Sequence, residues 1–234
     1  MLSLIEKSGI SMTILLTVLS IFMTACGTYT LSKNDRIVFF GDSITELGVK
    51  PNGYISLLRQ KFDQNDKTKN VETIGAGISG HKVPDLLARV QRDVLSKNPT
   101  IVFLYIGIND VWHSVLPGHF GTPPDEYKAG LISLVNQMKT SGIRVILCTP
   151  TTIGEKTDGT NPLDSKLDEY AAIVRCVAQA ERVELCDLRT IFMNFLKQNN
   201  PQNVEQGILT YDGVHLTDHG NQLVADSMLQ TWRH

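Results

Sequence analysis

Short apolar runs alternate with segments of helical periodicity along most of this chain, beginning near Arg36. Five of the runs are rich in β-branched or aromatic residues and end at polar residues or glycine, which is typical of buried strands. The predicted strands cover residues 37–40, 71–75, 101–106, 143–148 and 183–186. The run at 101–106 is apolar throughout, as expected of a central parallel strand that is covered on both faces.

Between these strands, apolar residues recur at intervals of three and four, the spacing of a helix with one buried face. Helices are predicted at 53–62, from Pro84 to Val94, after Pro124, from Asn161 onward, around 192–196 and after Thr217. The glycine-rich segment 75–80 is predicted as a turn, 107–123 as a long loop, and Thr122 as the cap of the helix that follows. The alternation predicts an α/β fold in which right-handed crossovers join five parallel strands.

Several residues with useful chemistry follow the predicted strands. Ser43 comes just after the first strand, Gly80 ends the glycine-rich turn after the second, and Asn109 follows the third. In an open parallel sheet the loops at the carboxyl ends of the strands meet at one edge, where ligands bind. We therefore expect these three residues to share one site.

The segment Asp212-Gly213-Val214-His215 supplies what a serine nucleophile lacks. Serine needs a base to take its proton, and histidine suits that task near neutral pH. Asp212 can hold the imidazole in the required tautomer, while Asn109 and the backbone N–H groups of Ser43 and Gly80 can stabilise an oxyanion. The constellation predicts a serine ester hydrolase.

Each piece also has a plain structural interpretation. A serine after a strand is commonly a cap or turn residue, Asp-Gly is a common turn pair, and Asn109 is a candidate helix cap. Only the joint occurrence of the segments, and their order along the chain, favours a catalytic site over these readings.

The blocks at 41–43, Gly80, 107–110 and 212–215 resemble the ordered motifs of the SGNH hydrolases, also called the GDSL esterase/lipase family. The resemblance implies a flavodoxin-like, three-layer α/β/α fold, a Ser43–Asp212–His215 triad, and an oxyanion hole made by Ser43, Gly80 and Asn109. It implies neither a metal nor an organic cofactor. Gly75 stands where many members have Asn, which leaves Gly77 as an alternative donor to Gly80.

Residues near Ser43 and in the loop after the third predicted strand are the candidates for binding the substrate. Asp42, Trp112, His113 and Phe120 are the candidates for a substrate pocket. The sequence has no extended apolar lid, which favours short acyl esters, including acetyl groups on carbohydrate. The alternatives are a lysophospholipase, a thioesterase, an acyltransferase, and a lipid-tethered binding protein that keeps the fold without turnover.

The first 26 residues differ from the rest of the chain. Residues 8–25 carry no charge and are followed by Cys26, and the order Met-Thr-Ala-Cys resembles a lipobox. We predict a signal peptide over 1–26 with lipidation at Cys26, a tether over 27–35, and a hydrolase domain over 36–234. The protein would then be exported and anchored to a membrane, at the periplasm or cell surface. An ordinary secretory signal and an uncleaved anchor are the alternatives.

Charge and cysteine content narrow the remaining classes. A formal net charge of −2 provides no basic field for nucleic acid. No Cys/His spacing matches a zinc site. Cys148, Cys176 and Cys186 lie in apolar contexts and are predicted as small buried residues, with a Cys176–Cys186 disulfide as the alternative.

Overall fold

The computed structural model describes residues 31–231, which form a five-stranded parallel sheet with strand order β2-β1-β3-β4-β5. The strands are β1 (Arg36–Gly41), β2 (Glu72–Gly77), β3 (Ile101–Tyr105), β4 (Arg144–Cys148) and β5 (Glu184–Cys186). All four strand pairs are parallel. The predicted α/β class and the five-stranded sheet are confirmed.

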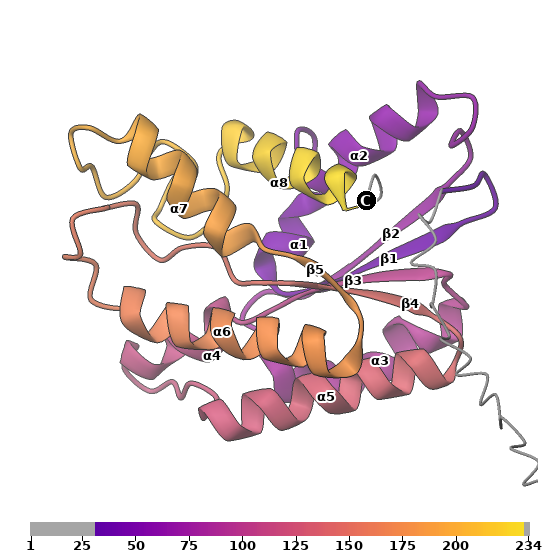
Figure 1. Cartoon of the computed structure of the whole chain (residues 1–234), viewed down its shortest axis with the longest axis horizontal. Coiled ribbons are helices and arrows are strands. Elements are labelled where there is room, and N and C mark those ends of the chain that lie inside the picture. The colour runs from indigo at the N-terminus through magenta and orange to yellow at the C-terminus, as the bar shows by residue number, and fades with distance from the viewer. Residues whose placement is uncertain (1–30, 232–234) are drawn as a thin grey trace, which may run out of the picture.

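Helices cover both faces of the sheet and make three layers (Figure 1). One layer contains α1 (Ser43–Gly48), α2 (Tyr54–Asp63), α7 (Leu188–Asn199) and α8 (Asp218–Gln230), and the other contains α3 (Val83–Asp93), α4 (Ile108–Trp112), α5 (Pro124–Thr140) and α6 (Asp164–Glu181). Two short 3₁₀ turns, η1 (Leu95–Lys97) and η2 (His113–Val115), follow α3 and α4. The arrangement agrees with the α/β/α fold that the motifs imply.

The core lies where the central strands meet the helices. Every residue of β3 is buried, as its continuous apolar run predicts. Phe39 of β1 stacks on Phe103 of β3 with ring centroids 5.4 Å apart, and Tyr54 of α2 meets Phe39 edge-on. These aromatic contacts fix β1 against β3 and α2, so the end of β1 is a well-supported platform for whatever follows it.

Four local predictions were wrong. The segment after β3 is not one long loop, because α4 and η2 occupy most of its first half. Helix α5 begins at Pro124 with Pro123 as its cap, while Thr122 donates its backbone N–H to the carbonyl of Asp110 and caps nothing. Strand β2 continues through Gly77, so only the last part of the glycine-rich segment turns. The sixth helix starts at Asp164, slightly later than the Asn-Pro pair suggested.

The prediction that all three cysteines are buried is wrong for Cys176. Cys148 and Cys186 are buried, face each other in register across β4 and β5, and are free thiols. Cys176 is also free but is exposed, because the buried face of α6 is set by Leu167, Tyr170, Val174 and their neighbours. The alternative of a Cys176–Cys186 disulfide is therefore not realised.

The predictions for residues 1–26, for Cys26 and for the first part of the tether lie outside the described residues. Within residues 31–231, the helices are all too short or too polar to cross a bilayer.

Candidate active site

Ser43 is placed by the abrupt end of β1. The strand stops at Gly41, Asp42 caps the next helix, and Ser43 is the first residue of α1. A β-carbon at Gly41 would lie 2.3 Å from the carbonyl oxygen of Tyr105 and 2.4 Å from Oγ1 of Thr45, so glycine is required there. This close approach lets the chain turn directly from the strand into the helix that carries Ser43, which is 8% exposed.

Asp42 serves the same turn. Its Oδ1 accepts a hydrogen bond from the N–H of Ile44 at 3.0 Å, and its side chain is almost fully buried. Burial raises the pKa of Asp42 to about 7, against the opposing effect of the Ile44 hydrogen bond, and the nearby charge of Asp110 raises it further. Asp42 is therefore occupied with capping α1.

His215 reaches Ser43 from the other end of the chain. Its Nε2 lies 2.9 Å from Ser43 Oγ, and its Nδ1 lies 2.6 Å from Oδ2 of Asp212. The structure thus brings together all three residues of the predicted triad. With Nδ1–H bonded to the carboxylate, Nε2 is the free base that can accept the serine proton.

The turn that carries the imidazole is closed by its own carboxylate. Oδ1 of Asp212 accepts the backbone N–H groups of Val214 at 3.0 Å and His215 at 2.7 Å. Burial raises the pKa of Asp212, but the hydrogen bonds from the ring and backbone of His215 and from Val214 outweigh it, and the pKa lies below its usual value. Gly213 adopts a φ of +89°, a left-handed conformation that glycine permits. Asp212 therefore stays ionised while it orients the ring.

Gly80 and Gly77 differ clearly in their surroundings. Gly80 has a φ of +77°, and the nearest atom to a β-carbon built there is Cε1 of His113 at 3.9 Å. At Gly77 a β-carbon would lie 2.1 Å from the N atom of Glu46, because α1 packs directly on β2 at that point. Gly77 is explained by packing, whereas the space beside Gly80 is open to a ligand.

Asn109 lies at the start of α4 and is 3% exposed. Its Nδ2 donates a hydrogen bond to the backbone carbonyl of His81 at 3.1 Å. A side-chain amide has two N–H donors, so one donor fixes the amide and the other remains for an oxyanion.

The sequence reasoning missed Arg89 of α3, whose side chain binds the segments that carry Ser43 and Gly80. Its guanidinium donates to the carbonyls of Gly41 at 2.7 Å and Ala76 at 3.0 Å, and to Nδ1 of His81 at 3.1 Å. It therefore connects the ends of β1 and β2 to the residue that holds Asn109. An arginine on a helical face gives no sequence signal for this role.

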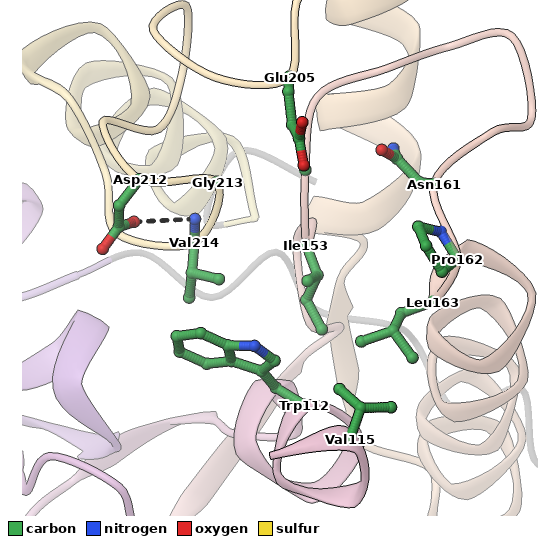
Figure 2. A pocket seen from close by; sticks show the side chains of 11 residues that line it. Trp112, Val115, Ile153, Asn161, Pro162, Leu163, Glu205, Asp212, Gly213 and Val214 are labelled. Atoms are coloured by element: carbon green, nitrogen blue, oxygen red, sulfur yellow. Dashed lines mark hydrogen bonds between the residues drawn. The ribbon is translucent and has the colours of Figure 1, made fainter. Parts of the chain in front are cut away.

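A cavity of about 390 Å³ lies beside the turn that contains Asp212 (Figure 2). Its apolar walls come from Trp112, Val115, Ile153, Leu163 and Val214, and its polar groups from Asn161, Glu205 and Asp212. Figure 2 shows the indole of Trp112 below Val214, so one wall joins α4 to the histidine-bearing turn. The cavity is large enough for one ring-sized group.

Of the four predicted pocket residues, only Trp112 lines this cavity. Asp42 lies buried under Ser43, and His113 lies near Gly80 with its ring 4.9 Å from that of His119. The side chain of Phe120 is 81% exposed, and its carbonyl accepts a hydrogen bond from Lys82. Among residues 31–231, no cluster of histidine, cysteine or acidic side chains could hold a metal ion.

Comparison with known proteins places these features in context. Residues 39–223 match the model of the GDSL-like Lipase/Acylhydrolase family. An acetylxylan esterase from Geobacillus stearothermophilus is 30% identical over 215 residues, covering 86% of this chain and 94% of that protein. A human isoamyl acetate-hydrolyzing esterase 1 homolog is 29% identical, covering 85% and 81%. The crystal structure of the acetyl xylan esterase AlAXEase is 44% identical, with a TM-score of 0.81 and coverage of 83% and 98%.

Proposed function

We propose that Ser43, His215 and Asp212 are the catalytic triad of this chain. The chain belongs to the GDSL-like lipase/acylhydrolase family and is a carboxylic ester hydrolase. One observation supports this assignment above the others. The Nε2 atom of His215 lies 2.9 Å from Ser43 Oγ while Asp212 holds the opposite ring nitrogen, although 172 positions separate the serine from the histidine.

The reaction follows from the geometry as a two-step acyl transfer. Ser43 Oγ attacks the ester carbonyl and passes its proton to His215 Nε2, and the carbonyl oxygen becomes an oxyanion. The backbone N–H groups of Ser43 and Gly80 and the amide of Asn109 stabilise that charge. His215 then protonates the leaving alcohol. In the second step, His215 takes a proton from water as the water attacks the acyl-enzyme, and it returns that proton to Ser43 Oγ when the acid leaves.

The substrate we propose is an acetyl ester of a carbohydrate. The relatives named above as acetylxylan or isoamyl acetate-hydrolyzing esterases act, by their names, on acetyl esters. The leaving alcohol takes its proton from His215, so it departs on the side of the 212–214 turn, where the cavity lies. The cavity offers an indole face and polar side groups, a combination that suits a sugar ring.

The charges around the cavity disfavour the alternative substrates. Two of the residues that line the cavity, Glu205 and Asp212, carry carboxylates. The nearby ammonium of Lys156 is already paired with Glu205, at 3.8 Å. A phosphate-bearing leaving group, as in a lysophospholipid or a coenzyme A thioester, would meet carboxylates where it needs cations. Acyl transfer to a second alcohol would use the same residues and is distinguished only by product analysis.

The test compares kcat/KM for acetyl, butyryl and octanoyl p-nitrophenyl esters, acetylated xylo-oligosaccharides, a lysophospholipid and acetyl-coenzyme A. We expect the acetyl esters, and the oligosaccharides among them, to be the best substrates. Preference for the octanoyl ester or the lysophospholipid would overturn the substrate assignment. A fluorophosphonate probe should label Ser43, whereas a pure binding protein with this fold would not react.

We also propose export and lipid anchoring through the N-terminal segment. The support is the uncharged stretch at 8–25 and the Met-Thr-Ala-Cys order that ends at Cys26. Cells fed an alkyne fatty acid should label the wild type and a Cys176→Ala variant but not Cys26→Ala. Labelling that persists in Cys26→Ala would contradict the lipidation site.

A further inference from the structure

The β4–α6 loop contains a carboxylate that the catalytic mechanism does not use. Glu155 has no exposed surface. Within residues 31–231 its carboxylate oxygens are bound by hydrogen-bond donors of residues 208–210 and not by a cation. Its Oε1 accepts the backbone N–H groups of Leu209 at 2.7 Å and Thr210 at 2.5 Å, and the hydroxyl of Thr210 at 2.7 Å. Its Oε2 accepts the N–H of Ile208 at 2.9 Å. Three consecutive backbone N–H groups thus converge on one side chain.

The segment that Glu155 binds leads directly into the catalytic turn. Asp212 follows Thr210 by two residues, and the chain returns from His215 to pair with the same segment. Thr210 forms a bridge with Leu216, and the N–H of Thr217 donates to the carbonyl of Leu209 at 2.9 Å. The carboxylate therefore holds the base of a closed loop whose tip carries Asp212 and His215.

Backbone contacts from the same loop extend this attachment. The N–H of Gly154 donates to the carbonyl of Gly213 at 2.8 Å, inside the catalytic turn itself. The N–H of Glu155 donates to the carbonyl of Glu205 at 2.8 Å. The segment between α7 and α8 has no extended strand of its own, and these contacts take the place of a sheet.

We propose that Glu155 is a positioning residue for the catalytic base, an inference that rests on the proposed function of the triad. Its carboxylate sets the path of residues 208–210 and thereby places the imidazole of His215 against Ser43. A carboxylate is suited to this task because it only accepts hydrogen bonds, and the segment presents only donors to it. Charge-assisted bonds of this kind are about twice as strong as neutral ones.

The principal test is Glu155→Gln, which keeps the shape but turns one arm into an N–H donor that faces backbone donors. We expect kcat for p-nitrophenyl acetate to fall roughly 10- to 100-fold with little change in KM, because a shift of about 1 Å in a catalytic group has effects of that size. Glu155→Asp keeps the acceptors and should recover part of the loss. Thr210→Val removes one bond to the carboxylate and should lower kcat only a few-fold.

A matched control is Asp187→Asn, which removes another carboxylate with several partners at this edge of the sheet. Asp187 binds Arg175, Thr149 and the N–H of Thr190, and no residue of the 205–215 segment. Active sites are counted by fluorophosphonate titration, and kcat per active site of Asp187→Asn should stay within about two-fold of the wild type. A selective loss of kcat in Glu155→Gln then cannot come from a general destabilisation of the fold.

The second readout does not depend on turnover. The proton shared by His215 and Asp212 should give a far-downfield ¹H NMR resonance in the wild type, and Glu155→Gln should broaden or abolish it while circular dichroism is unchanged. Wild-type kcat and an unchanged resonance in Glu155→Gln would overturn the positioning role. A wild type with this resonance but no esterase activity would instead refute the proposed function.

Discussion

The two halves of the proposed catalytic site are held in place by different means. Ser43 and Asn109 follow β1 and β3, neighbouring strands in which Gly41 and Tyr105 are paired in register. His215 and Asp212 belong to an irregular segment that contains only an isolated bridge. The sheet places the proposed nucleophile and oxyanion donor, whereas a buried carboxylate and a few loop contacts place the proposed base.

This difference teaches where the site is vulnerable. A residue at the end of a central strand is fixed by many aromatic and aliphatic contacts, so the loss of one of them is shared among the rest. The base depends on a small number of polar groups, and removing one leaves its buried partners unsatisfied. We therefore expect point changes remote from the substrate to damage the base half first.

The largest expected effect comes from the nucleophile half. Ser43→Ala should lower kcat for p-nitrophenyl acetate by at least ~10⁴-fold, because it removes the proposed nucleophile. Ser56→Ala, on the surface of α2, serves as the control and should retain full activity. If Ser43→Ala kept most of its turnover, the triad assignment would be refuted and the comparison of the two halves would lose its basis.

The oxyanion donor should matter less than the nucleophile. Asn109→Ala is expected to lower kcat by roughly 10²–10³-fold with KM within a few-fold, the usual effect of removing one donor. Asn109→Asp keeps the side-chain shape but cannot donate, so it should be equally impaired. Near-normal rates in both variants would remove Asn109 from the oxyanion hole and leave the triad untouched.

The fold was largely predictable because its elements obey simple periodicity. The continuous apolar run of β3 and the β-branched residues of β1 identify buried strands without any tertiary information. The short helices were harder to find. Helix α4 has only 5 residues, too few for a periodic pattern to emerge, and its first residues follow a glycine with no side-chain cap. Cys176 shows the same limit, since an apolar neighbourhood in sequence does not say which side of a helix faces outward.

The residues of the candidate site could be selected from the sequence to the extent that they carry chemistry in their own side chains. Ser43, Asn109, Asp212 and His215 are such residues, and the structure brings Ser43, Asp212 and His215 into one hydrogen-bonded chain. The supporting residues were not predictable. Glu155 stands among polar and glycine residues that are typical of a surface loop, yet it is fully buried. Only the backbone donors around it, which no sequence pattern encodes, reveal its role.

A third prediction concerns the carboxyl group that supports the nucleophile half. The ordinary pKa of Asp42 is 3.8, and burial raises it to about 7 in the folded protein. Between these values the unfolded state releases a proton that the folded state keeps, so the contribution of Asp42 to stability decreases as pH rises. Asp42→Asn can still cap α1 through its amide oxygen but does not titrate. Its stability relative to the wild type should therefore improve by roughly 2 kcal/mol between pH 5 and pH 8.

Urea unfolding at both pH values measures this difference directly. Taking the variant minus the wild type removes the effects of other titrating groups, such as His81 and His113, whose pKa values are lowered chiefly by burial. A difference that does not change with pH would mean that Asp42 is ionised in the folded protein. The N-cap of α1 would then be an ionised carboxylate.

The smallest expected effect tests the cavity that spans both halves. Trp112 belongs to α4 on the nucleophile side, and it faces Val214 of the base side (Figure 2). Trp112→Ala should raise KM for acetylated xylo-oligosaccharides about tenfold, a loss of about 1.4 kcal/mol, because the sugar would lose one wall. KM for p-nitrophenyl acetate should change little, since its small leaving group needs less of the cavity. Trp112→Phe keeps an aromatic face, so its KM for the oligosaccharides should lie between those of the wild type and Trp112→Ala. An equal rise for both substrates would mean that Trp112 supports the catalytic residues and that the cavity does not hold the leaving group.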